Sequence, residues 1–258
     1  MSDIALLGSQ VRYEQKSYWR NPLAAGFTFL FPLVLFFILV GVTKSSTDTK
    51  DLGRGVHLAQ YLTPSVLSYA VMSACFMSVA MTLVRQRESG VLKRMRGTPV
   101  PSWAVIGGII GNAVIVATAL SLVSIVFAIT AYGVSFPAAD ILPTVVTIAL
   151  AAVAFCALGV AVSTLIPNVD SGPAIVNVPY FLLVFISGTY FPISGTMAHI
   201  AAWLPLRPFI VALYYHGAFS PLNSGSAWAW HQLGSLLLWG IGSTIFAARH
   251  FKWTPRRG

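Results

Sequence analysis

Residues 104–132 read AVIGGIIGNAVIVATALSLVSIVFAITAY and contain no Asp, Glu, Lys or Arg. A helix of this length, at about 1.5 Å per residue, is longer than the roughly 30 Å hydrocarbon core of a bilayer. The apolar residues are continuous rather than alternating, and a backbone in lipid must satisfy its own hydrogen bonds. This stretch therefore predicts a membrane-spanning helix, which is long enough to tilt or to extend beyond the bilayer.

Five further apolar runs of spanning length surround it. They occupy residues 23–42, 62–84, 141–166, 173–191 and 228–248. The whole chain of 258 residues is 56 % hydrophobic and only 9 % charged, with a mean hydropathy of +0.76. Soluble domains carry about 25 % charged residues, so this composition excludes a soluble or disordered chain. The fold prediction is an all-α polytopic membrane protein, one transmembrane domain over residues 1–258 with six transmembrane helices.

The distribution of basic residues predicts the orientation of these helices. Twelve of the 16 Lys and Arg residues fall on the same side as the N-terminus, in the segments around residues 12–20, 85–96 and 249–257. Basic residues are retained in cytoplasmic loops, which also explains the net charge of +9 without nucleic-acid binding. Both termini are therefore predicted to be cytoplasmic.

The first 22 residues are predicted to form an amphipathic helix at the membrane interface. Ile4, Leu7, Val11 and Tyr18 share one face at helical spacing, whereas Arg12, Lys16 and Arg20 share another. Such a helix lies along the inner leaflet with its cations toward anionic headgroups, and Asn21-Pro22 ends it. Two roles remain open, a membrane anchor and a docking surface for a cytoplasmic partner.

The loop 192–227 differs from the others because it is apolar yet rich in proline and glycine. Proline at this density prevents one continuous helix. Short stretches at 197–204 and 209–215 are predicted to be half-helices at the outer interface, and the nearby Trp and Tyr residues match an aromatic belt there.

Residue types needed for catalysis are not gathered at one depth of the predicted membrane domain. All five His residues lie outside the spans or near their ends, and Cys75 and Cys156 lie in separate apolar runs. We therefore predict no catalytic site, metal or cofactor in this chain. No Gly-x-x-x-x-Gly-Lys-Ser/Thr phosphate loop is present, so energy for uphill transport must come from another polypeptide.

The predicted cytoplasmic loop 85–103 begins RQRESGVLKRMRGTPVP. Val91, Leu92 and Met95 form a small apolar face, whereas neighbouring Lys and Arg side chains point elsewhere. A short amphipathic helix between two long spans is suited to docking in a groove of a partner. On charge alone, an ordinary positively charged cytoplasmic loop is the alternative.

Two motifs in this chain resemble those of the ABC transporter type-2 permeases. Glu88-x-Gly90-x-Leu92 with Arg94-x-Arg96-Gly97-Thr98-Pro99 looks like the coupling-loop motif of that family, which includes daunorubicin-resistance permeases. Ser187-Gly188-Thr189-Tyr190-Phe191-Pro192 followed by Trp203-Leu204-Pro205 and Arg207-Pro208 is similar to its second motif. Arg207 departs from that pattern, where a less charged residue is expected.

The resemblance implies a permease subunit that exports a hydrophobic or amphipathic compound (a drug, antibiotic, lipid or glycolipid) across a bacterial inner membrane. Two permease copies, identical or homologous, would pair with two copies of a separate ATPase that binds ATP and Mg. It also implies two sets of site residues. The residues coupled to the ATPase would be Arg87, Glu88, Gly90, Leu92, Arg94, Arg96, Thr98 and Pro99. The outer gate would comprise Gly188, Phe191, Pro192, Leu204, Pro205 and Pro208.

A substrate path is the least determined part of the prediction. Candidate lining residues are Asn112, Thr118, Asn177, Phe181 and Phe185. Polar residues within spans more commonly bond between packed helices, and aromatic residues more commonly pack against helices or lipid. For the whole chain, the alternative function is a non-energised membrane assembly or channel component, which would need no nucleotide-binding partner.

Overall fold

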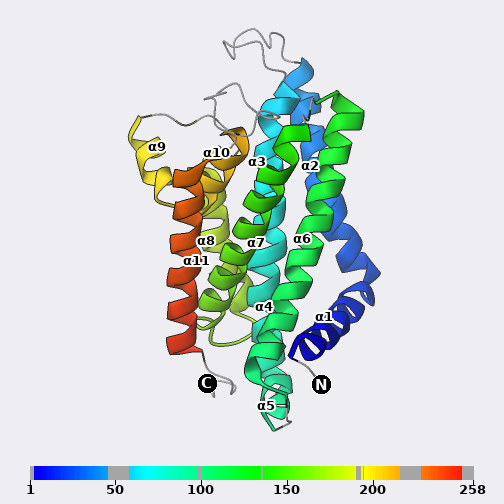
Figure 1. Cartoon of the computed structure of the whole chain (residues 1–258), viewed down its shortest axis with the longest axis vertical. Coiled ribbons are helices and arrows are strands. Elements are labelled where there is room, and N and C mark those ends of the chain that lie inside the picture. The colour runs from blue at the N-terminus through cyan, green and yellow to red at the C-terminus, as the bar shows by residue number, and fades with distance from the viewer. Residues whose placement is uncertain are drawn as a thin grey trace.

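The computed structural model describes residues 3–45, 58–97, 100–134, 136, 138–189, 193, 195–215 and 228–251. Within these residues the fold is entirely helical and contains no strand (Figure 1). The elements are α1 (Asp3–Trp19), α2 (Pro22–Ser45), α3 (Leu58–Met72), η1 (Ser73–Met77), α4 (Ser78–Glu88), α5 (Val91–Arg96), α6 (Ser102–Tyr132), η2 (Ala138–Asp140), α7 (Ile141–Ser163), α8 (Gly172–Ile186), α9 (Gly195–Ala202), α10 (Leu206–Tyr215) and α11 (Trp230–His250).

A helix or a run of helices lies in each of the six predicted ranges, but they differ in length. Three are long and apolar enough to cross a membrane, namely Leu62–Glu88, Ser102–Tyr132 and Ala138–Ser163. The apolar parts of α2 and α8 are shorter, at Ala25–Ile38 and Gly172–Ile186. The described residues thus support a multi-pass helical membrane protein, and the number of six spans stays a prediction.

The second predicted span contains a π-helical turn, η1, between α3 and α4. At this turn α7 passes unusually close. A Cβ atom on Gly159 of α7 would lie 2.7 Å from the carbonyl oxygen of Phe76 in η1, closer than Cβ atoms approach backbone. Gly159 is therefore required for this packing. The contact sits in the core, where α7 also packs against α11, α4 and α6.

The two ends of the bundle carry different structures (Figure 1). The beginning of α1, the end of α11 and the short α5 lie at one end, whereas α9 and α10 lie at the opposite end. This arrangement is consistent with both termini lying on one side of the membrane. Helices α9 and α10 are bent by 102° at the break between them. Half-helices are thus present in the loop where prolines predicted them.

Candidate functional site

The predicted coupling loop forms a tight helical hairpin. Helix α4 ends at Glu88, and α5 begins at Val91. Between them Gly90 has a φ of 70°, in the left-handed region that side chains rarely adopt. An added Cβ would meet no atom within 4 Å. The glycine in the motif is therefore explained by backbone conformation rather than by packing.

Helix α5 has one buried anchor and an exposed basic surface. Leu92 is fully buried (0 % exposed), whereas Lys93 and Arg94 are exposed. The anchored side orients α5, and its cations are available to a partner in the aqueous phase. Arg96 is the last residue of α5, and its side chain, like Thr98 and Pro99, lies outside the described part of the chain.

The side chain of Arg87 is buried, whereas its place in a basic loop suggested an exposed cation. Its side chain is only 2 % exposed. Nη1 donates a hydrogen bond to the carbonyl oxygen of Ser163 at 3.1 Å, and Nη2 donates to the carbonyl oxygen of Ile166. The Ser163 carbonyl lies at the end of α7, where helix carbonyls lack intrahelical donors, and Ile166 lies just beyond that end. Arg87 thus fastens α4 to the end of α7 and to the residues that follow it.

Glu88, the next residue, makes a second link to the same segment. Its Oε1 accepts a hydrogen bond of 2.7 Å from the backbone N–H of Val169. The N-cap residue of α5 is Gly90, which has no side chain to cap the helix. Arg87 and Glu88 together join the coupling hairpin to residues 164–171, which connect α7 to α8. These bonds connect the hairpin to the segment that leads into α8.

Helix α1 is packed onto this end of the bundle rather than lying only on the membrane surface. Three glycines of α6 allow the approach. Added Cβ atoms on Gly107, Gly108 and Gly111 would lie 2.6–2.8 Å from side-chain atoms of α1. The partners on α1 are Leu7, Gln10 and Val11. The apolar face predicted for α1 is thus partly used within the protein, although Ile4 remains 84 % exposed.

A hydrogen bond also links α1 to the coupling hairpin. Gln86 Nε2 donates to Glu14 Oε1 at 3.0 Å, one residue before Arg87. Glu14 is buried. Desolvation raises the pKa of its carboxyl above the ordinary value of 4.5, and the hydrogen bond from Gln86 partly opposes that rise.

We expect Glu14→Gln to stabilise the protein at pH 7.5. Because the folded-state pKa of Glu14 is raised, its contribution to stability is greatest below the unfolded-state pKa and is lost as pH rises through the folded-state pKa. Glutamine keeps a hydrogen-bond acceptor without the charge. In thermal unfolding in detergent, the variant should melt at a higher temperature than the parent at pH 7.5, and the difference should disappear near pH 4. Asp3→Asn, at an exposed position of α1, is the control.

The opposite end of the bundle holds the second motif. Gly188 has a φ of 75°, and an added Cβ would lie 2.9 Å from both Arg207 Nη1 and Ile193 Cγ1. Nη1 of Arg207 donates a hydrogen bond of 3.2 Å to the carbonyl oxygen of Ser187, at the end of α8. A cation at a helix C-terminus also interacts favourably with the helix dipole. Arg207, the departure from the family pattern, therefore completes the end of α8.

The remaining residues of this motif are only partly described. Leu204 is half-buried, and Pro205 and Pro208 are buried, so they fix the bend between α9 and α10 within the fold. Phe191 and Pro192 lie outside the described residues. The prediction that the fifth apolar run stays helical to residue 191 is wrong, because α8 ends at Ile186 and the left-handed Gly188 follows directly.

The candidate path residues lie on two helices. Asn112 and Thr118 belong to α6; Asn112 is buried, whereas the hydroxyl of Thr118 bonds to the carbonyl of Val114 in its own helix. Asn177, Phe181 and Phe185 follow one another at i, i+4 and i+8 on α8, and both phenylalanines are exposed. Helix α8 packs against α4 and η1. The two sets therefore lie on helices that do not pack closely against each other.

Ser163, Ile166 and Val169 belong to the candidate site but were missed by sequence reasoning. Each takes part through its backbone, so its side chain carries no sign of the role. The glycines of α6, in contrast, did carry a signal. Gly107 and Gly111 have the i, i+4 spacing that permits close helix crossing.

Comparison with known proteins relates these motifs to a transporter family. The family model described as "ABC-2 type transporter" matches residues 6–217, from α1 to the end of α10. The chain is also 24 % identical over 208 residues to the Bacillus subtilis (strain 168) protein named "Putative transport permease YvfS". That alignment covers 79 % of this chain and 82 % of the relative.

Proposed function

The chain belongs to the ABC-2 type transporter family, and from this membership we propose that it is the membrane subunit of an exporter driven by a separate ATPase. In this proposal both termini and α5 lie in the cytoplasm, and the membrane domain crosses the bilayer six times. The position of α5 is the observation that carries the proposal. It is anchored by Leu92, presents exposed cations, and is bonded through α4 to the connection between α7 and α8.

The same contacts suggest how ATP binding and hydrolysis by the partner drive transport. Closure of the ATPase pair displaces α5, and α4 moves with it as a rigid body. Arg87 and Glu88 carry the displacement to residues 164–171 and so to the cytoplasmic end of α8. At its other end α8 is held by Arg207. The exposed face with Phe181 and Phe185 then changes its position relative to a second permease copy.

The cargo proposed is a hydrophobic or amphipathic compound such as a drug, antibiotic, lipid or glycolipid. The exposed apolar face of α8 supports it, because Phe181 and Phe185 are 51 % and 62 % exposed. A path between two permease copies would place these rings opposite each other. Asn177, on the same face, would supply a hydrogen-bonding group to an amphipathic molecule.

Co-expression with an ATPase encoded beside this gene is the experiment that tests the function. A tag on this chain should retain the ATPase during purification, and inverted membrane vesicles should accumulate a fluorescent amphipathic dye only with ATP. An ATPase variant that cannot hydrolyse ATP should abolish accumulation. A chain that purifies alone and whose vesicles show no ATP-dependent uptake contradicts the proposal and favours a non-energised membrane component.

Gly188→Leu is expected to abolish transport while the protein still inserts in the membrane. Leucine at a φ of 75° is strained, and its Cβ would meet Ile193 and Arg207 within 3 Å. The substitution should therefore release the end of α8 from its bond with Arg207. Dye uptake and membrane abundance are measured together. The control is Gly195→Leu, because Gly195 has a similar φ of 61° but open space around an added Cβ. Equal transport by the two variants would contradict a role for Gly188 in the outer gate.

A further inference from the structure

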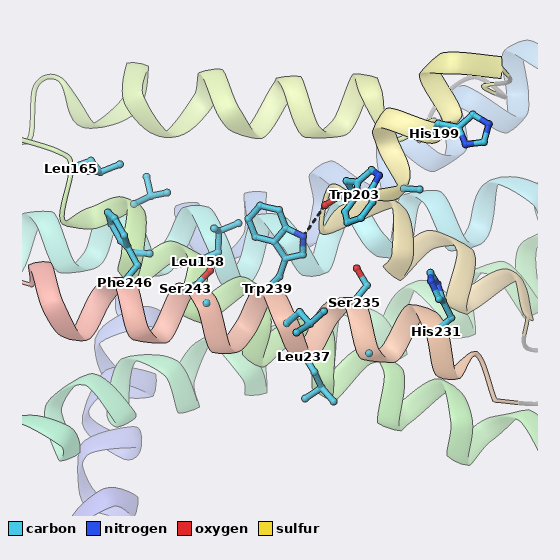
Figure 2. A pocket seen from close by; sticks show the side chains of 16 residues that line it. Leu158, Leu165, His199, Trp203, His231, Ser235, Leu237, Trp239, Ser243 and Phe246 are labelled. Carbon is cyan, nitrogen blue, oxygen red and sulfur yellow. Dashed lines mark hydrogen bonds between the residues drawn. The ribbon is translucent and has the colours of Figure 1, made fainter.

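A long apolar groove runs along α11 on the side of the bundle formed by α7 and α9. Its volume is about 1260 Å³, whereas pockets for drug-sized ligands occupy about 300–1,000 Å³. Figure 2 shows α11 along its length, with α9 at one end, and the last part of α7 lines the other end. Leu158 of α7 and Leu165, two residues beyond its end, line the groove, and α11 contributes Gly234, Leu238, Gly242 and Phe246.

The two ends of the groove differ in chemistry. His199 of α9 and His231 at the beginning of α11 lie at the same end, on different sides of the groove, whereas Leu165 and Phe246 lie at the other end (Figure 2). The histidine end is the end of the bundle that carries α9 and α10. In a bilayer it therefore lies at headgroup depth, and the remainder of the groove lies in hydrocarbon.

A tryptophan pair holds α9 over this end of the groove. Trp239 Nε1 donates a hydrogen bond of 2.9 Å to the carbonyl oxygen of Trp203. The Trp203 side chain is itself 81 % exposed, as is typical of the aromatic belt at a membrane interface. The groove is thus built between a membrane-interface turn and the length of one helix.

The length of the groove fits a hydrocarbon chain. From His231 to Phe246 the helix rises about 22 Å at about 1.5 Å per residue. One leaflet of a bilayer contributes about 15 Å of hydrocarbon, so an extended acyl chain can lie along the groove from the headgroup region. Two glycines keep it open. An added Cβ on Gly234 or on Gly242 would meet no atom within 4 Å.

From these observations we propose that the groove binds a phospholipid of the leaflet on the α9–α10 side. One acyl chain lies against α7 and α11, and the headgroup phosphate accepts hydrogen bonds from His199 and His231. The site is separate from the proposed cargo surface, since no residue of α8 lines it. Binding depends only on the chain residing in a bilayer, so it stands or falls independently of the proposed export function.

Photo-crosslinking in vesicles of defined composition tests this site. The purified chain is reconstituted in phosphatidylethanolamine and phosphatidylglycerol, with a trace of phosphatidylethanolamine that carries a diazirine in one acyl chain. After irradiation, mass spectrometry locates the adduct. We expect adducts concentrated on residues 234–246 of α11 and on residues 158–165, at the end of α7 and just beyond it. Gly242→Leu, which fills the groove, should lower them at least fivefold.

The control is Gly26→Leu on α2, an exposed glycine that also has no atom within 4 Å of an added Cβ; its adducts should match those of the parent. Gly234→Leu tests the other half of the groove if Gly242→Leu does not fold. Replacing both His199 and His231 with alanine should reduce the phospholipid that remains bound through detergent purification.

Adducts spread evenly over α2, α8 and α11, or undiminished in both glycine variants, would overturn the site and indicate surrounding lipid alone. A second copy of the chain is the other occupant to be tested. Leu238→Cys places a thiol in the groove, and the native Cys75 and Cys156 are buried. Disulfide-linked dimers formed through residue 238 in the bilayer would also overturn the lipid assignment.

Discussion

Arg87→Met is expected to destabilise the protein by about 3 kcal/mol and to lower transport about tenfold. The first figure follows from leaving buried carbonyls at the end of α7 without their donor, at about 1–3 kcal/mol for each unsatisfied group. The tenfold loss of transport is the size expected when a coupling free energy of about 1–3 kcal/mol is lost. Methionine fills a similar space, so the effect reports the lost hydrogen bonds to Ser163 and Ile166 rather than a cavity.

Arg85→Met is the matched control for Arg87→Met. It makes the same chemical change two residues earlier in α4, at an exposed position, and should leave both stability and transport close to those of the parent. Arg87→Lys keeps the charge but lacks the planar fork that reaches two carbonyls, so its effect should be intermediate. Thermal unfolding and ATP-dependent dye uptake are measured on the same preparations. Equal behaviour of the Arg85 and Arg87 methionine variants would contradict the role of Arg87.

The apolar runs located the helices because a bilayer imposes a simple length requirement on them. The run at 104–132 corresponds to α6 (Ser102–Tyr132), and the proline-rich loop was correctly divided into short helices. The π turn η1 was not predictable, since one extra residue per turn leaves no residue pattern. Its partner Gly159 looked like any other small residue in an apolar run.

The coupling hairpin was located by its motif, but its contacts were not. The sequence shows charges and not their partners, so Arg87 was indistinguishable from the exposed Arg85 and Arg94. Only packing reveals that Arg87 is buried and bonded to carbonyls about 80 residues away in the chain. The close approach of α1 to α6 was not predicted, although the i, i+4 spacing of Gly107 and Gly111 permits it, because both glycines lie within a stretch already explained as a membrane span.

Glu88→Arg is expected to leave the permease–ATPase complex assembled but to abolish transport. The carboxylate accepts the N–H of Val169, and arginine offers no acceptor to replace it. The added positive charge would also lie beside Arg85 and Arg87, in a hairpin that is already basic. The link between α5 and the start of α8 should therefore break, and ATP hydrolysis should no longer respond to cargo.

Glu88→Gln separates the hydrogen bond from the charge. The amide oxygen can still accept from Val169, so if Glu88 acts through the connection between α7 and α8, this variant should keep most of the transport. If instead the charge pairs with a cation on the ATPase, Glu88→Gln should lose transport as fully as Glu88→Arg, and a reversed charge on the ATPase should partly restore the arginine variant.

Normal transport by Glu88→Arg in an assembled complex would reduce Glu88 to a local contact, worth less than about 1 kcal/mol at an exposed site. Dye uptake and cargo-stimulated ATPase activity, measured on one reconstituted preparation of each variant, distinguish these three results.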